Sequence, residues 1–227
     1  MEPGERSGSF HGRRKGKALR AGQDRLIHEL LPRLRVPDGP IEPLSELFAR
    51  RPACIHLEIG FGGGEHLLAR ARAAPDTGFI GCEPFVNGMA KLLAIVEAER
   101  LDNIRVFDRD ATELLARLPG TSIDRTYLLF PDPWPKRRQR KRRFVSAANL
   151  AALARVLKPG AEFRFATDID DYAGWALARV LASPDFRWSP AGPDDWRRPW
   201  AGWPGTRYEA KAVREGRPST YLTVLRS

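Results

Sequence analysis

The amino-acid sequence predicts an α/β fold, with a mostly parallel seven-stranded sheet that carries helices on both faces. From residue 53 onward, short apolar runs alternate with stretches of helical periodicity, and Gly or Pro residues separate them. Such strand–helix repeats make each strand parallel to the previous one, and the crossover helices then cover the sheet. A length of 227 residues and a hydrophobic content of 42% suit one such domain.

Each expected strand is a short apolar run bounded by turn-forming residues. The strands are expected at 53–60 (ACIHLEIG), 77–83, 103–108, 122–130 and 161–167, with a sixth at 186–189 and a seventh at 219–225. The helices between them are expected at 65–74, 88–99, 111–118, 144–157 and 170–181. Pro119-Gly120 and Lys158-Pro159-Gly160 are stop signals for two of these helices.

The chain is divided into three segments. Residues 1–22 are rich in Gly and Arg and have no apolar periodicity, so we expect a flexible basic arm. Residues 23–52 are expected to hold a helix at 24–34 and a linker punctuated by prolines. Residues 53–227 form the main domain, without an internal repeat or a second domain boundary.

The positive charge is concentrated in two places. The chain has 38 Lys and Arg against 28 Asp and Glu, a formal net charge of +10. Residues 1–25 and the segment KRRQRKRR at 136–143 hold seven basic residues each, and the remainder is nearly neutral. Since 31 of the basic residues are Arg, whose guanidinium binds phosphate with two hydrogen bonds, the pattern favours a nucleic-acid partner over a merely solvated surface.

Several classes of protein are excluded as leading interpretations. No uncharged stretch approaches the length of a bilayer span, and the basic N-terminus lacks the apolar core of a signal peptide. Cys54 and Cys82 fall at opposite ends of two expected strands, roughly 15 Å apart if these are neighbours, which is too far for a disulfide. The histidines show no metal-ligand spacing (His11, His28, His56, His66). We expect a reduced, cytoplasmic, metal-free protein.

A glycine-rich turn follows the first expected strand. Ligands of parallel α/β sheets bind at the carboxyl ends of strands, where Gly60 and Gly62 allow close approach of the backbone. The turn is no dinucleotide fingerprint, because Glu65 stands where that motif needs glycine, and the Gly-Lys-Ser/Thr of a P-loop is absent. Glu58, inside the apolar strand, needs a cationic or hydrogen-bonding partner if it is buried.

Two more acids follow the next two strands. Glu83 ends the second strand, where a carboxylate can accept both hydroxyls of a ribose. Asp110 follows the third strand, where it either accepts from an adenine amino group or caps the helix that begins at Ala111. Three acids at successive strand ends, with a glycine turn at the first, resemble the cofactor site of class I S-adenosylmethionine-dependent methyltransferases.

The fourth strand runs into the sequence FPDPWPKRRQRKRR at 130–143. Its three prolines make a stiff turn that presents Asp132. A structural proline turn explains the prolines, but it leaves the acid and Trp134 beside seven basic residues unexplained. Trp134 is either a stacking surface for a base or a residue of the core.

This segment resembles the signature of the bacterial tRNA (guanine-N7)-methyltransferase family, usually written FPDPWPKKRHNKRR. The chain departs from it at Arg137, Gln139 and Arg140. The sequence ATD at 166–168 and the TRYE sequence at 206–209 resemble two further motifs of the family, in the expected order. The resemblance covers roughly residues 53–225.

The resemblance implies a class I methyltransferase (Rossmann-like) fold at 53–227. It implies methyl transfer from S-adenosylmethionine to N7 of a guanosine in the tRNA variable loop (position 46), giving 7-methylguanosine and S-adenosylhomocysteine. The implied partner is tRNA, bound by a monomer or homodimer without metal. The implied residues are catalytic Asp132; cofactor-binding Glu58, Gly60, Gly62, Glu83, Asp110 and Asp132; and substrate-binding Lys136, Asp168, Thr206, Arg207, Tyr208 and Glu209.

Other functions are less well supported by the residues. A non-catalytic RNA-binding protein on a degenerate fold predicts loss of the cofactor acids, yet all of them are present. A methyltransferase for another base fits the FPDPW turn but neither its PWPK extension nor the TRYE sequence. Glu65 disfavours a nicotinamide oxidoreductase. Trp196, Trp200 and Trp203, before the TRYE sequence, form either a lid on the sheet or a platform for a base.

The distribution of charge predicts different salt dependences for the two ligands. If the arm and the KRRQRKRR segment bind tRNA phosphates, raising the salt concentration from 50 to 200 mM weakens tRNA binding by about 10²-fold or more. Binding of S-adenosylhomocysteine stays nearly unchanged over the same range. Titrations of both ligands at several salt concentrations test this, and equal salt sensitivity contradicts it.

Overall fold

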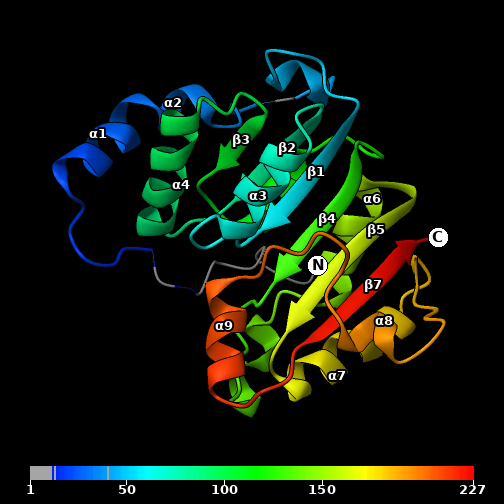
Figure 1. The fold of residues 1–227 in the computed structure, drawn as a ribbon. Helices are drawn as coiled ribbons and strands as arrows, with labels where there is room; N and C mark the ends of the chain where they lie inside the picture. The colour runs from blue at the N-terminus through cyan, green and yellow to red at the C-terminus, as the bar shows by residue number, and fades with distance from the viewer. Residues whose placement is uncertain (1–11, 13, 40) are drawn as a thin grey trace, which may run out of the picture.

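The computed structural model describes residue 12 and residues 14–39 and 41–227. Over these residues the strands form one seven-stranded sheet in the order β3–β2–β1–β4–β5–β7–β6 (Figure 1). The strands are β1 (Cys54–Ile59), β2 (Thr77–Cys82), β3 (Ile104–Phe107), β4 (Ile123–Leu129), β5 (Leu157–Thr167), β6 (Phe186–Arg187) and β7 (Thr220–Arg226). Neighbours among β1–β5 pair in parallel, and β7 is antiparallel to β5 and β6. The expected mostly parallel sheet is confirmed.

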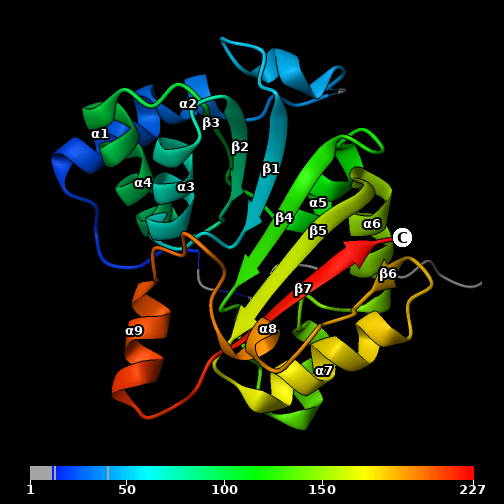
Figure 2. The same cartoon turned by 45° about the vertical axis from the view of Figure 1, so that its right-hand side comes forward.

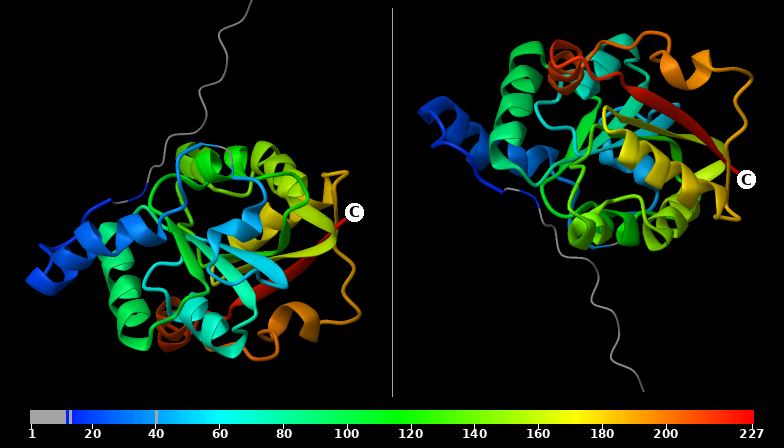
Figure 3. Two further views of the ribbon diagram at one scale, coloured as in Figure 1. Left: turned by 90° about the horizontal axis from the view of Figure 1, so that it is seen from above. Right: turned by 90° about the horizontal axis from the view of Figure 1, so that it is seen from below.

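Helices cover both faces of the sheet, as expected (Figures 1 and 3). The α-helices are α1 (Ala21–Glu29), α2 (Leu31–Leu34), α3 (Glu65–Ala73), α4 (Val86–Glu99), α5 (Ala111–Arg117), α6 (Ala147–Val156), α7 (Asp170–Leu181), α8 (Asp194–Arg197) and α9 (Arg207–Arg214). Two 3-10 helices are η1 (Leu44–Leu47) and η2 (Arg137–Arg142). The views agree that α3 and α4 lie on one face and α5, α6 and α7 on the other (Figure 2).

Several expected elements have different bounds in the structure, and the helix α9 was not expected. The helix expected at 24–34 is two helices, α1 and α2, which meet at Leu30. The helix expected at 144–157 begins only after Ser146, whose Oγ accepts from the Asn149 N–H at 3.3 Å. It ends before Leu157, which pairs with Ile123 as the first residue of β5. Residues 207–214, where no element was expected, form α9.

The two faces of the sheet differ in chemistry because side chains alternate along each strand. Ile55, Leu57 and Ile59 of β1 join the main apolar core, to which α5, α6 and α7 contribute. The alternate residues His56 and Glu58 are buried on the opposite face. This second face therefore holds polar groups that need partners, and it faces α3.

The two cysteines lie at opposite ends of neighbouring strands, as expected. Cys54 is opposite Thr77 in the register of β1 and β2, whereas Cys82 is opposite Ile59 at the other end. Both thiols are free, and burial raises the pKa of Cys82 well above its ordinary value.

The described residues include no cluster of His, Cys, Asp and Glu that could hold a metal ion, and none of their helices is long and apolar enough to cross a membrane.

The described part of the N-terminal arm lies against the start of α4. The Gly16 N–H donates to Asn87 Oδ1 at 2.7 Å, and Asn87 Nδ2–H donates to the Lys17 carbonyl at 2.7 Å. The Val86 N–H donates to the Arg14 carbonyl at 3.0 Å. Residues 1–11 and 13, which include the basic residues Arg6 and Arg13, lie outside the described residues, so the flexible arm stays a prediction.

The fold predicts that Gly88, in the first turn of α4, accepts no side chain. An added Cβ would lie 2.1 Å from the Gly62 carbonyl oxygen, far inside van der Waals contact. We expect Gly88→Ala to lower the free energy of unfolding by about 1–3 kcal/mol. The matched control is Gly174→Ala in α7, where a Cβ meets nothing within 4 Å; it should be neutral or stabilising by about 0.5–1 kcal/mol. Urea unfolding measures both, and equal effects contradict the prediction.

Candidate functional site at the carboxyl edge of the sheet

Backbone hydrogen bonds hold the ends of the parallel strands at one edge. The Gly60 N–H donates to the Cys82 carbonyl at 2.8 Å, and the Glu83 N–H to the Phe107 carbonyl at 2.9 Å. The Phe130 N–H donates to the Ala166 carbonyl at 2.8 Å. The segments that follow β1, β2, β3, β4 and β5 therefore begin side by side.

The glycine turn after β1 has a backbone that other residues rarely adopt. Gly60 and Gly62 have φ angles of 73° and 58°. A Cβ on Gly62 would lie 3.2 Å from Arg207 Nη2 and 3.3 Å from Cε2 of Tyr208. The turn therefore lies directly against the start of α9, which brings two expected cofactor residues beside two expected substrate residues.

Glu83 is buried and fixes the same turn. Its Oε2 accepts from the Gly62 N–H at 2.7 Å, and its Oε1 accepts from the Phe85 N–H at 2.9 Å. Burial raises the pKa of the carboxyl, and the nearby charge of Asp132 adds to this shift. Each oxygen still has a lone pair for a ribose hydroxyl.

Glu58 has the buried partner that its position in the strand requires. His66, at the start of α3, donates from Nδ1 to Glu58 Oε2 at 2.6 Å. Both side chains are 4% exposed. His66 belonged to no expected site, and the only signal for it in the sequence is its place in the first turn of the helix after the glycine turn.

Asp110 caps α5, one of the two roles that the sequence left open. Its Oδ1 accepts from the N–H and from the hydroxyl of Thr112, both at 2.8 Å. The cap uses one carboxylate oxygen, so an additional contact from Oδ2 to an adenine amino group stays a prediction.

Asp132 stands on a turn with an unusual backbone. Phe130 and Trp134, two residues before and after it, have φ angles of 49° and 43°. Left-handed conformations at non-glycine residues cost energy and persist only where the surroundings impose them. The Asp132 side chain is exposed at the edge of the sheet, yet the protein around it raises the pKa of its carboxyl through desolvation.

Arg143, the last residue of the KRRQRKRR segment, anchors this turn and does not face solvent. It is 2% exposed, and its Nε donates to the Pro133 carbonyl at 2.8 Å. Its Nη1 donates to the Asp171 carbonyl at 3.2 Å, and its Nη2 pairs with the Asp171 carboxylate. The guanidinium also lies 4.8 Å from the Tyr172 ring centroid. The segment therefore supplies an anchor as well as a charged surface.

The remaining basic side chains of this segment are arranged on η2 and beside it. Arg140 pairs with Asp171 at 2.8 Å, and the guanidinium of Arg142 lies 5.0 Å from the Trp134 ring centroid. The other basic residues are exposed, including the expected substrate residue (Lys136, Arg137, Arg138, Lys141). Trp134 is half-buried, so its indole both contacts Arg142 and remains partly accessible.

Asp168, after β5, is held by an arginine that the sequence did not single out. Arg217 donates to Asp168 Oδ2 from Nε at 2.8 Å, and its Nη2 lies 2.7 Å from the same oxygen. Arg217 follows α9 in the chain. Asp168 is therefore tied to the segment between α9 and β7.

The TRYE sequence begins α9, where two of its residues hold the helix in place and the other two lie over the glycine turn. Thr206 caps the helix, since its Oγ1 accepts from the Glu209 N–H at 3.1 Å. Glu209 accepts from Trp203 Nε1–H at 2.6 Å and from the Tyr221 hydroxyl. Arg207 and Tyr208 lie over the glycine turn, and Arg207 Nη2 donates to the Tyr208 hydroxyl at 3.0 Å. Thr206 and Glu209 thus hold the helix that presents the other two.

Two of the tryptophans before α9, Trp200 and Trp203, form a lid on the polar face of the sheet. Trp200 Nε1–H donates to the Thr223 hydroxyl at 2.8 Å, and the Trp203 ring lies 5.2 Å from the His66 ring. Trp200 and Trp203 pack on a small buried cluster that includes Tyr127 and Tyr221. Trp196 packs against Trp188, 5.7 Å between centroids. The structure therefore shows the packing of all three indoles, and a role as a platform for a base stays a prediction.

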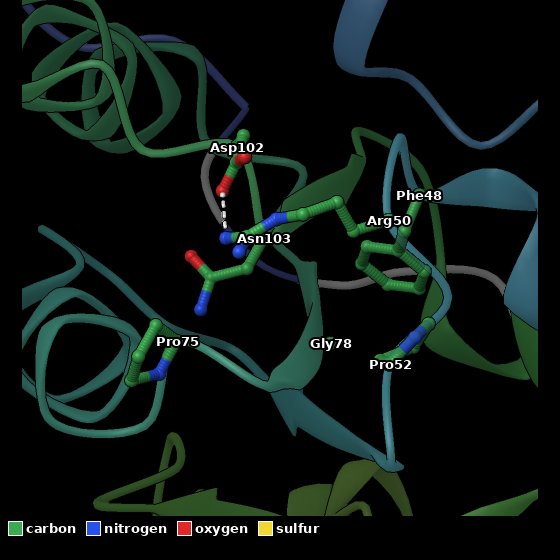
Figure 4. Close-up of a pocket in the computed structure, with 7 residues that line it drawn as sticks. All are labelled: Phe48, Arg50, Pro52, Pro75, Gly78, Asp102 and Asn103. Carbon is green, nitrogen blue, oxygen red and sulfur yellow. Dashed lines mark hydrogen bonds and ion pairs between the residues drawn. The ribbon is translucent and has the colours of Figure 1, made fainter.

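Two hollows lie away from this edge. A groove of about 440 Å³ lies between α8 and β7, at the level where Thr223 pairs with Arg164 and Leu225 with Glu162 near the middle of β5. A pocket of about 10 Å³ lies near the amino ends of β2 and β3, beside the Arg50–Asp102 ion pair at 3.4 Å (Figure 4). The expected site residues line neither hollow.

Comparison with known proteins gives the following relatives. Residues 52–222 match the family model described as "Putative methyltransferase". The chain is 55% identical over 220 residues to the tRNA (guanine-N(7)-)-methyltransferase of Chelativorans sp. (strain BNC1), covering 96% of this chain and 95% of that protein. It is 58% identical over 217 residues to the protein of the same name in Rhodopseudomonas palustris (strain ATCC BAA-98 / CGA009), covering 95% and 82%.

Solved structures are similar in fold at low sequence identity. The 16S rRNA methyltransferase KamB superposes with a TM-score of 0.55 at 20% identity, covering 78% of this chain and 89% of that one. A SAM-dependent O-methyltransferase of Thermotoga maritima gives a TM-score of 0.51 at 13% identity, covering 91% and 71%. The expected class I methyltransferase (Rossmann-like) fold is confirmed.

Because Arg143 is buried, we expect it to be the residue of the KRRQRKRR segment that stabilises the fold. We expect Arg143→Ala to lower the free energy of unfolding by about 2–4 kcal/mol, because it removes three hydrogen bonds and leaves a cavity under the Asp132 turn. The matched control is Arg138→Ala on the exposed side of η2, expected within about 0.5 kcal/mol of the parent. Denaturant unfolding compares them, and a neutral Arg143→Ala contradicts the anchor.

Proposed function

Because the chain belongs to the tRNA (guanine-N7)-methyltransferase family, we propose that it transfers a methyl group from S-adenosylmethionine to N7 of a guanosine in tRNA. The products are 7-methylguanosine and S-adenosylhomocysteine, and the target is the variable-loop guanosine, position 46. The proposal rests above all on the Asp132 turn, which lies between a glycine turn backed by buried acids and an exposed basic surface. A tRNA substrate and two free thiols suit a cytoplasmic protein.

The residues at the edge fit S-adenosylmethionine, whose sulfonium supplies the methyl group when it is bound. Buried Glu83 retains lone pairs for ribose hydroxyls, and Asp110 retains one carboxylate oxygen. Glu58 adds a negative charge beside the glycine turn, which suits a cationic ligand. A Cβ on Gly60 would meet nothing within 4 Å, so the backbone is open to close approach at this residue.

Asp132 is the group we assign to the reacting guanine. N7 of guanine has an in-plane lone pair that is not protonated at neutral pH, so the reaction needs no general base. An Asp132 carboxylate facing the Watson–Crick edge accepts from N1–H and from the 2-amino group. Those donors become more acidic as positive charge develops on the ring, so the hydrogen bonds strengthen in the transition state. The proposed catalysis is thus positioning plus electrostatics.

The substrate side combines basic and aromatic groups around Asp132. Lys136 and the exposed arginines of η2 are suited to tRNA phosphates. Across the glycine turn, α9 presents Arg207 and Tyr208, a cation and an aromatic ring suited to a nucleotide. Asp168 with Arg217, and α9 with its Thr206 cap and Glu209 anchor, complete the proposed substrate side.

The described arm adds basic residues to the same edge. Arg14, Lys15 and Lys17 lie beside the start of α4, which directly follows Glu83 and Phe85. The arm lies on the β2 side of the glycine turn, whereas η2 follows the turn after β4. Positive charge on both sides of Asp132 suits a polyanion that passes over the edge.

The test is methylation of bulk tRNA followed by mass spectrometry of its nucleosides. With S-adenosylmethionine, the parent protein should form 7-methylguanosine at a single position of tRNA. Asp132→Ala should reduce the rate by about 10²-fold or more and still bind tRNA, because the phosphate contacts lie elsewhere.

A control acid and two outcomes make this test decisive. Asp102→Ala, at the opposite edge of the sheet, should methylate at the parent rate. Full turnover by Asp132→Ala would remove Asp132 from the mechanism. Cofactor binding without any methylated product would instead favour the RNA-binding interpretation.

A further inference from the structure

A buried polar contact holds the cofactor side of the proposed site. Glu58 on β1 accepts from His66 Nδ1–H on α3 at 2.6 Å, and both side chains are 4% exposed. Burying a carboxylate without such a partner costs free energy, so the carboxylate of Glu58 is most stable where it can accept from this donor. His66 therefore determines the direction in which Glu58 presents its second oxygen, Oε1.

The ring of His66 is itself clamped between two aromatic side chains. Its centroid lies 4.6 Å from that of Tyr127 on β4 and 5.2 Å from that of Trp203 in the lid. The two interplanar angles are 62° and 39°. In this arrangement the imidazole directs Nδ1 to Glu58, and its ring lies against the indole of Trp203.

Trp203 carries this contact to the substrate side. Its Nε1–H donates to Glu209 Oε2 at 2.6 Å, and the Tyr221 hydroxyl donates to the other oxygen of Glu209. Glu209 lies in the first turn of α9, next to Arg207 and Tyr208, which cover the glycine turn. Movement of Trp203 would therefore move the residues that face the substrate.

We propose that His66 is a positioning residue that sets both halves of the site at once. Its Nδ1–H orients Glu58 for the cofactor, and its ring seats Trp203, which holds α9 for the nucleotide. In-line methyl transfer depends on the relative placement of two substrates, and a misplacement of about 1 Å costs on the order of 10²-fold in rate. The inference rests on the proposed function, because it concerns how that site is held.

The first test separates the hydrogen bond of His66 from its bulk. Asparagine places its amide nitrogen close to the position of Nδ1, whereas the longer glutamine places it near Nε2. Titration calorimetry with S-adenosylhomocysteine, without RNA, measures the affinity of the full chain. We expect His66→Asn to bind within about threefold of the parent, and His66→Gln to bind about tenfold more weakly or worse, the usual effect of losing a hydrogen bond to a charged group.

The second test addresses the contact with α9. Trp203→Phe keeps a ring on His66 but removes the donor to Glu209. We expect it to raise KM for tRNA by about tenfold while the affinity for S-adenosylhomocysteine stays within about twofold of the parent. The matched control is Trp196→Phe, since Trp196 packs on Trp188 and contacts neither His66 nor Glu209 in the described residues; it should change neither quantity.

Three results would overturn the proposal. The first is that His66→Asn and His66→Gln bind S-adenosylhomocysteine with equal affinity. The second is that Trp203→Phe has the KM of the parent for tRNA. The third is that the affinities of the variants for S-adenosylhomocysteine simply follow their melting temperatures. The calorimetric test needs no methylation. If the parent binds S-adenosylhomocysteine but forms no 7-methylguanosine, the proposed function fails while the assignment of His66 is still decided by its two variants.

Discussion

Parallel pairing of β1 with both β2 and β4 is the constraint on which the site depends. Ile59 lies opposite Cys82 on one side and Leu128 on the other, so the three strands end at the same level. The glycine turn, Glu83 and the Asp132 turn follow these ends and therefore share one edge, although they are far apart in sequence. A shift of β1 by one residue in its register with β2 and β4 would turn Glu58 toward the apolar core, where its charge would be buried without its partner.

The polar face of the sheet explains why the segment before α9 is rich in tryptophan. Over β1 and β2 this face is covered by α3, whereas over β5 and β7 no described helix longer than the one turn of α8 covers it (Figure 2). Indoles combine a large apolar surface with one N–H donor, so Trp200 and Trp203 can cover polar residues and still satisfy Thr223 and Glu209. The lid is thereby joined to α9, so packing on the sheet also orients the residues proposed to face the nucleotide.

The basic segment after Asp132 shows how one charge pattern can serve two physical purposes. Arg143 is buried among Tyr172, Trp175 and the Pro133 carbonyl, where it fixes the strained turn. Arg138 and its exposed neighbours keep their charge in water, where long-range attraction to a polyanion operates. Anchor and attractive surface are parts of one short 3-10 helix and its flanks, so the proposed phosphate contacts are held at a fixed place relative to Asp132.

The sequence by itself determined the sheet, the order of its strand–helix units and the edge at which the acids gather, because local periodicity and turn residues encode these features. It also determined the need of Glu58 for a partner and the capping option at Asp110. Only the tertiary structure decided that the partner is His66, that Arg143 faces inward, that the TRYE residues start a helix, and that Trp200 and Trp203 form a lid. These depend on contacts between residues distant in the chain, where packing and the pairing of buried charges override what composition and spacing indicate.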